Sequence, residues 1–227
     1  MIDTQLYRHR FSETEIAQQR RFWRPICNYL QRYVHPDGVT LDLGAGFCHF
    51  INNIRSREKI ALDINEENLR RYADKGVRII AASGADLSMV PSASVDTVFA
   101  SNVYEHFQSR EQVTASFAEV HRILRHDASF IILQPNFTYC WRHYFDFFDH
   151  RLIFTHLGMV EGLLTCGFEV AEVVARFLPF TSKGRLPTSP WLVWLYLRVR
   201  LSWRILGGQM LIVARKSGRA GAASLSQ

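Results

Sequence analysis

Acidic residues follow three successive short apolar segments, and the first of these junctions also contains two glycines. Asp42 precedes Gly44 and Gly46, Asp63 closes the next apolar run, and Asp86 follows the third. Glycines permit backbone torsions and a close ligand approach that a Cβ would block. An acid at the end of the second run can accept the hydroxyls of a ribose. With no basic phosphate clamp among these acids, they predict a site for a cationic nucleoside that has no phosphate groups.

Histidines and amides further along the chain supply candidates for a group-transfer step. His106 follows the fourth apolar run, where a histidine can take up a proton near neutral pH. The segment 134–156, after the fifth run, is rich in polar side chains. We predict His106, His143 and His150 as catalytic residues, and Tyr104, Asn136 and Tyr139 as substrate contacts.

The same segment contains groups that can in principle bind a divalent ion, namely Asp146, Asp149, His150 and His156. Their spacing matches no recognised metal-ligand pattern. Polar groups satisfied by hydrogen bonds are therefore the favoured interpretation, and we predict no metal site.

Alternating strands and helices must position these residues. Ser12 and Glu15 have capping-box spacing at the start of a predicted helix over 12–33. We predict strands at 39–43, 60–64, 77–81, 95–101, 130–133, 168–176 and 209–215, with helices at 47–55, 66–75, 109–124 and 155–166. Short apolar strands separated by helices indicate an α/β fold with a parallel sheet covered on both faces. Ligands of such sheets bind at the carboxyl ends of the strands.

Composition is that of a globular protein. The 227 residues are 48% apolar and 21% charged, which excludes a largely disordered chain. None of the four cysteines belongs to a CxxC pair, which predicts a reducing, cytoplasmic location. The N-terminal region is rich in Arg, Gln and Glu, which predicts that it is not a secretory leader. The longest all-apolar run is Trp191–Leu197, too short for a membrane span of about 20 residues.

The excess of positive over negative charge comes from the C-terminal quarter of the chain. The chain has a formal net charge of +6, yet no Asp or Glu occurs after Glu172. Within this quarter, Ser189-Pro190 predicts the start of a helix and Gly207-Gly208 its end. This basic aromatic insert, residues 178–208, is typical of a helix at a membrane interface, with the protein at the inner face of the membrane. A helix packed on the sheet or forming a homodimer is an equally favoured alternative, and residues 197–205 also alternate as a strand would.

The combined motifs resemble the class I methyltransferases that depend on S-adenosylmethionine (SAM). The resemblance covers residues 38–135 and the ending 209–216, and its most specific pieces are 41–48, 61–65, 84–87, 95–106 and 119–124. It implies a Rossmann-like, seven-stranded, mostly parallel sheet with an antiparallel last strand, and SAM as cofactor. The implied cofactor contacts are Asp42, Gly44, Ala45, Gly46, Asp63, Ile64, Asp86, Leu87 and Asn102. Cys48 stands where many relatives have a third glycine, so a slightly altered loop is expected.

The resemblance implies domain boundaries and a function. Residues 1–36 form a helical cap in which 7–11 either close over the cofactor as a lid or pack on the sheet, residues 37–216 form the methyltransferase domain, and 217–227 form a disordered tail. A looser similarity to bacterial methyltransferases of glycan or glycolipid assembly implies an acceptor hydroxyl on a sugar or lipid-linked glycan. Two alternatives stay open, an RNA methyltransferase and a non-catalytic SAM-binding partner of a membrane complex. A nicotinamide enzyme is disfavoured because His49 replaces a glycine its motif needs.

Overall fold

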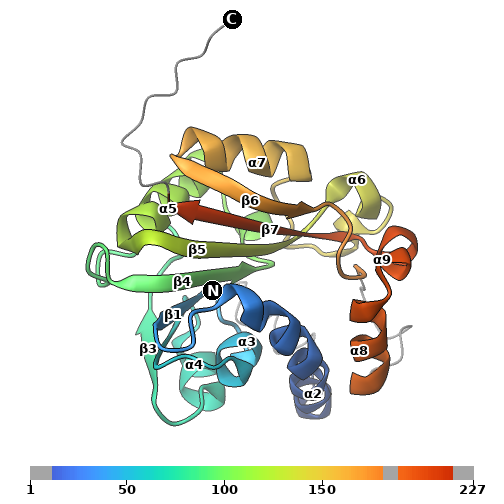
Figure 1. Ribbon diagram of the computed structural model, residues 1–227, viewed down its shortest axis with the longest axis horizontal. Helices are drawn as coiled ribbons and strands as arrows, with labels where there is room; N and C mark the ends of the chain where they lie inside the picture. Colours follow the sequence, from blue (N-terminus) through green and yellow to red (C-terminus); the bar gives the residue numbers. More distant parts are fainter. Residues whose placement is uncertain (1–11, 181–188, 217–227) are drawn as a thin grey trace, which may run out of the picture.

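A seven-stranded sheet forms the centre of the computed structural model, which describes residues 12–180 and 189–216 (Figure 1). The strands are β1 (Val39–Leu43), β2 (Glu58–Asp63), β3 (Val77–Ala81), β4 (Val95–Ser101), β5 (Leu124–Pro135), β6 (Phe168–Val174) and β7 (Gln209–Lys216). Their order in the sheet is β3-β2-β1-β4-β5-β7-β6. The first five pair in parallel, and β7 lies antiparallel between β5 and β6. The predicted α/β fold with an antiparallel last strand is confirmed.

Helices cover both faces of this sheet (Figure 1). They are α2 (Glu13–Leu30), α3 (His49–Asn53), α4 (Glu66–Tyr72), α5 (Arg110–Ile123), α6 (Phe137–Cys140), α7 (His156–Thr165), α8 (Pro190–Arg198) and α9 (Arg200–Leu206). Three 3-10 turns join them, η1 (Gln31–Tyr33), η2 (Tyr104–His106) and η3 (Tyr144–Asp146). No helix within the described ranges has both the length and the apolar character that crossing a membrane requires.

Two apolar cores follow from this layering, one on each face of the sheet. Val113 and Phe117 of α5 and Met159 of α7 pack on one face. Residues of α2, α3, α8 and α9 pack on the other, where Phe50 stacks on Phe99 with ring centroids 3.8 Å apart. The parallel strands are buried from both sides, which is why they appear in the sequence as short, almost continuous apolar runs.

Local chemistry explains where the helices begin. The capping box predicted at Ser12 is present, because the Ser12 hydroxyl accepts the Glu15 N–H while the Glu15 side chain accepts the Ser12 N–H. The Thr155 hydroxyl caps α7 in the same way by accepting the Gly158 N–H at 3.2 Å. Gly167, with φ of 85°, follows the end of α7 as the sequence predicts.

The structure differs from the predicted elements at several boundaries. The helix expected over 47–55 is the single short turn α3, because the chain uses residues 44–48 for a loop with left-handed torsions. The strand expected over 130–133 is the much longer β5. The helix expected after Ser189 divides at Val199 into α8 and α9, so the alternating pattern of 197–205 does not mark a strand. The expected lid residues 7–11 and tail 217–227 lie outside the described residues.

Candidate active site

The loop after β1 is tied by its backbone to the end of β2. The N–H groups of Gly44 and Ala45 both donate to the carbonyl oxygen of Leu62, at 2.8 and 3.0 Å. The Gly46 N–H donates to Asp63 Oδ2 at 2.9 Å, and Asn65 N–H donates to Asp63 Oδ1 at 2.8 Å. These bonds hold the Asp63 carboxylate against the glycine loop at the carboxyl edge of the sheet.

Three alternate positions of this loop have left-handed torsions. Gly44, Gly46 and Cys48 have φ of 72°, 51° and 58°. A Cβ on Gly44 would lie 2.4 Å from Val103 Cγ2, whereas a Cβ on Gly46 would meet no atom within 4 Å. Gly46 therefore presents bare backbone to open space, which suits a ligand that must approach closely. Cys48 has a left-handed torsion that glycine adopts more readily than other residues.

Two buried carboxyl groups lie beside this loop. Asp42 is only 3% exposed beneath α3, where its Oδ2 accepts the Ile51 N–H at 3.3 Å. The pKa of Asp42 is raised to about 8. Burial is the main cause and the nearby Asp63 carboxylate adds to it, while the hydrogen bond from the Ile51 N–H acts in the opposite direction. Burial also raises the pKa of Asp63, against three backbone N–H bonds that lower it. Negative charge is costly here, and a cationic ligand would offset that cost.

The other predicted cofactor contacts occupy the same edge with different exposure. Ile64 is 64% exposed immediately after Asp63. Asp86 is exposed after β3 and accepts the Ser88 N–H, whereas the Leu87 side chain lies in the core and leaves only its backbone for a ligand. Asn102, exposed at the end of β4, has φ of 53°. A left-handed non-glycine residue at a strand end is a strained position of the kind that clusters at functional sites.

A buried glutamate in η2, just after β4, lies within the candidate site and is not among the residues predicted from the sequence. Glu105 is fully buried, and its Oε2 accepts Gln134 Nε2–H at 2.6 Å. Its backbone carbonyl accepts the N–H groups of Arg151 and Leu152 at 2.7 and 3.1 Å, which holds residues 151 and 152 against η2. Burial raises the pKa of the Glu105 carboxyl, and the neighbouring His106 lowers it.

Two of the predicted catalytic histidines lie next to this glutamate. His106 Nδ1 lies 3.1 Å from the carbonyl oxygen of Asp149 and 3.5 Å from its Oδ2. Since a carbonyl oxygen only accepts, Nδ1 must carry the proton, and Nε2 is left as the basic nitrogen. Nε2 lies 4.0 Å from Glu105 Oε1. The rings of His106 and His150 are neighbours, with centroids 5.2 Å apart and planes inclined at 67°.

Glu105, His106 and His150 each offer one ligand atom, and these atoms all lie within 4.8 Å of one another. A divalent cation can bridge groups of these types after small side-chain adjustments. The three residues differ from the four considered in the sequence analysis. Only His150 is common to both sets.

The remaining predicted residues are distributed around this centre. Tyr104 is fully buried in the core, packing on Phe117, and has no surface to offer a substrate. Asn136 is also buried, and its Nδ2 donates to the Ala175 carbonyl at 2.8 Å. Tyr139 is 40% exposed, and His143 pairs with Asp146 in solvent at 3.0 Å. The structure places His106 and His150 together and gives His143 no contact with either among the described residues.

Several buried acceptor oxygens at this edge lack a donor. Within residues 12–180 and 189–216, no hydrogen-bond partner is found for Glu105 Oε1, Gln134 Oε1, Asn136 Oδ1 or Gln209 Oε1. Gln134 and Asn136 belong to the end of β5, and Gln209 begins β7 opposite Pro135. A buried acceptor without a donor costs about 1–3 kcal/mol. Glu105, Gln134 and Asn136 are fully buried, so these unsatisfied oxygens lie inside the fold and do not face a ligand.

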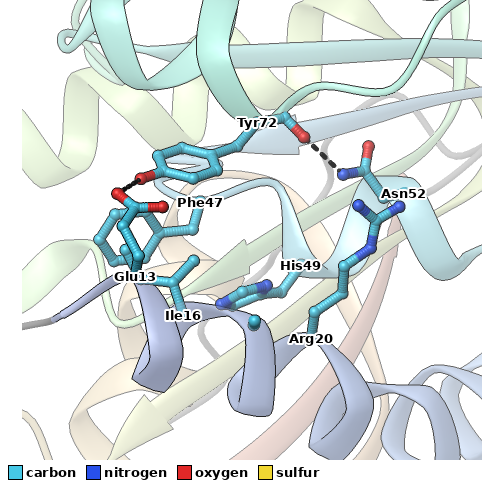
Figure 2. A pocket seen from close by; sticks show the side chains of 8 residues that line it. Glu13, Ile16, Arg20, Phe47, His49, Asn52 and Tyr72 are labelled. Atoms are coloured by element: carbon cyan, nitrogen blue, oxygen red, sulfur yellow. Dashed lines mark hydrogen bonds between the residues drawn. The ribbon is translucent and has the colours of Figure 1, made fainter.

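A small pocket separates α2 from the glycine loop (Figure 2). It holds about 160 Å³ and is lined by Glu13, Ile16, Ala17, Arg20, Phe47, His49, Asn52 and Tyr72. Tyr72 donates to Glu13 at 2.8 Å, and Arg20 pairs in bidentate fashion with Asp74. Ligand pockets usually hold roughly 300–1,000 Å³. This pocket is thus too small for a whole nucleoside cofactor. It is a gap left where α2 packs over the loop.

Comparisons with known proteins agree with this geometry. Residues 41–132 match the family model of a methyltransferase domain. A SAM-dependent methyltransferase from Archaeoglobus fulgidus aligns with a TM-score of 0.62 at 20% identity, over 84% of this chain and 93% of that one. One from Mesorhizobium loti aligns with a TM-score of 0.62 at 17% identity, over 86% and 97%.

A third structure is a complex between the Haloferax volcanii Trm112 methyltransferase activator and a protein described as a methyltransferase. It aligns with a TM-score of 0.64 at 18% identity, over 88% of this chain and 92% of that one. No curated protein matches the sequence. At these identities the solved structures support the shared fold.

Proposed function

We propose that this chain, in which residues 41–132 match the model of a methyltransferase domain and whose fold is shared with solved SAM-dependent methyltransferases, methylates a hydroxyl group of a sugar or lipid-linked glycan. SAM is the cofactor and S-adenosylhomocysteine (SAH) is the product. The single observation that supports a hydroxyl acceptor is His106, whose side chain is 26% exposed at this edge and whose Nδ1 is held by the Asp149 carbonyl, which leaves Nε2 to accept a proton. A hydroxyl acceptor must lose its proton, and a histidine suits that step near neutral pH.

The residues at the ends of β1 and β2 fit the cofactor. The Asp63 carboxylate accepts three backbone N–H groups and retains lone-pair capacity for a ribose hydroxyl. Gly44, Ala45 and Gly46 would border the methionine part, since Gly46 faces open space. The cost of negative charge at Asp42 and Asp63 favours a cationic ligand. Ile64, Asp86, the Leu87 backbone and Asn102 complete the proposed cofactor contacts, and α2 caps the loop.

When bound, SAM supplies a methyl group on a cationic sulfur, already activated for displacement. The protein must then align the acceptor oxygen and remove its proton. We assign the proton to His106 Nε2, because the Asp149 carbonyl holds the proton of Nδ1. The carboxylates of Glu105 and Asp149, at 4.0 and 3.5 Å from the ring nitrogens, would stabilise the resulting imidazolium. His150 borders the same ring, while His143 and Tyr139 are proposed as outer acceptor contacts.

The experiment that tests this proposal follows a labelled methyl group from SAM into extracts separated into lipid, glycan and RNA fractions. We expect label in a hydroxyl of the lipid or glycan fraction. His106→Ala should lower the rate by roughly 10²–10⁴-fold. His126→Ala is the matched control, because His126 is exposed at the amino end of β5. Label in RNA alone, or none in any fraction with SAH bound, would contradict the proposed acceptor.

A chelator separates two uses of the Glu105–His106–His150 cluster. If His106 acts as the base, full activity persists after EDTA treatment. If activity is lost and a divalent cation restores it, the three side chains are cation ligands instead, and the proton leaves by another route.

A further inference from the structure

The surface formed by α8 and α9 has an unusual composition. Every exposed side chain between Trp191 and Leu206 is either a large apolar group or an arginine. Trp191 and Leu201 are 62% and 65% exposed, and Ile205 is 66% exposed. Surface of a soluble domain normally mixes both signs of charge with small polar groups, so a patch this apolar indicates an interaction site.

This surface is not a loosely attached helix that could simply turn inward. Trp203 is buried against Phe177 and Tyr29, with ring centroids 5.1 and 5.8 Å away. Its Nε1–H donates to the Tyr196 carbonyl at 2.9 Å, and the Tyr196 hydroxyl donates to the Phe177 carbonyl at 2.6 Å. The inward faces are therefore fixed, and the exposed side chains remain on the outside.

The charge of the surface is entirely positive. Arg198 lies over the Trp194 ring at 4.2 Å, and Arg200 lies 5.8 Å from the Trp203 ring centroid. Among the described residues, none of the ion pairs involves Arg198, Arg200 or Arg204. Trp203 is buried, but Trp194 is 43% exposed, and a guanidinium beside an exposed indole ring, as at Arg198 and Trp194, suits anionic headgroups above an apolar layer.

The surface also continues to the edge of the sheet that carries the active site. Arg176 donates to the carbonyl oxygens of Ile205 and Gly207, and its guanidinium lies 4.7 Å from the Tyr139 ring centroid. Beyond Tyr139, the segment after α6 exposes Phe145 and Phe148, at 61% and 82%. Figure 1 shows α6 and α9 beside the start of β7, where the carboxyl end of β5 lies.

We propose that α8 and α9 bind the surface of an anionic lipid bilayer and turn the carboxyl edge of the sheet toward it. The apolar rings would enter the interfacial layer, and the three arginines would contact lipid phosphates. A second copy of the chain fits less well, because a symmetric contact would oppose these arginines with each other. The inference concerns binding alone and stands apart from the identity of the methyl acceptor.

Sedimentation with vesicles tests this inference without donor or acceptor present. We expect the wild-type chain to bind vesicles of phosphatidylcholine mixed with phosphatidylglycerol, and to bind phosphatidylcholine alone much more weakly. Combining Trp191→Ser, Leu201→Ser and Ile205→Ser should lower binding by more than about tenfold. Combining Arg198→Gln, Arg200→Gln and Arg204→Gln should lower it by about a hundredfold, on anionic vesicles only.

The matched control combines Leu157→Ser and Leu164→Ser, exposed on α7 at 70% and 55%, and should bind as the wild type does. Circular dichroism verifies that each variant is folded. The inference is overturned if the folded wild type binds neither vesicle, or if the serine variant binds equally well. It is also overturned if light scattering shows a wild-type dimer that the serine variant cannot form. Vesicle binding without methyl transfer would count only against the proposed acceptor.

Discussion

At the scale of single residues, Asp42 couples the proposed cofactor site to the stability of the fold. Burial raises its pKa to about 8, so the native state holds a proton that the unfolded chain releases above about pH 4. Stability from this group is fully present below the unfolded pKa and is lost as the pH rises through the native pKa. Asp42→Asn carries no charge at any pH and keeps an acceptor for the Ile51 N–H.

We therefore expect Asp42→Asn to gain stability over the wild type as the pH rises from 4 to 8. The gain in the free energy of unfolding should reach roughly 5 kcal/mol at pH 8, since one pKa unit corresponds to about 1.36 kcal/mol. Urea denaturation across this pH range measures it. Asp37→Asn, at an exposed position before β1, is the control and should leave the pH dependence unchanged. Curves for Asp42→Asn and wild type that stay parallel would show that Asp42 is ionised in the native state.

The position of a single residue can be predicted from the sequence where a local motif dictates the backbone geometry. Asp63 and the glycines of the loop could be predicted because a strand, a tight turn and a helix follow one another directly. Glu105 could not, because its burial depends on Gln134 of β5 and on the segment that pairs with its carbonyl. Asp149 contacts His106 across 43 positions of the chain, a distance over which no periodic pattern carries information.

At the scale of elements, the α8–α9 pair shows what a helical pattern leaves open. Three tryptophans occur between Trp191 and Trp203, and their arginine neighbours do not gather on one helical face. The sequence predicted a helix here but could not say which tryptophan faces the core. The break at Val199 decides this, since it turns α9 and buries Trp203 while Trp191 stays exposed.

Trp203→Ala should lower the free energy of unfolding by about 3–5 kcal/mol, because it leaves a cavity between Phe177 and Tyr29. Trp191→Ala, the matched control on the same pair of helices, should change it by less than about 0.5 kcal/mol. Urea denaturation monitored by circular dichroism distinguishes the two variants. Equal effects of both would mean that α8 and α9 do not pack on the sheet as described.

At the scale of the whole molecule, alternating strands and helices were enough to predict the layered α/β fold. Resemblance to a family supplied the antiparallel last strand, because chain order alone does not say that β7 inserts between β5 and β6. This insertion has a physical consequence. The same sheet carries the carboxyl edge with the proposed cofactor site, both apolar cores and the strand that follows α9. A ligand bound at the carboxyl edge should therefore stabilise the sheet, both cores and α9 together.

We accordingly expect SAH to shift a single thermal unfolding transition of the entire chain. Ligand at a hundred times its dissociation constant adds about 2.7 kcal/mol, which raises Tm by roughly 5–10 °C for a domain of this size. Scanning calorimetry measures the shift, and Asp63→Ala should abolish it, because that carboxylate links the glycine loop to the proposed ribose site. Asp86→Ala, on an exposed side chain at the same edge, should reduce the shift only in part. Two transitions, with SAH moving one of them, would show instead that the α8–α9 region unfolds independently of the carboxyl edge of the sheet. The proposed membrane-binding surface and the candidate active site would then be separate cooperative units.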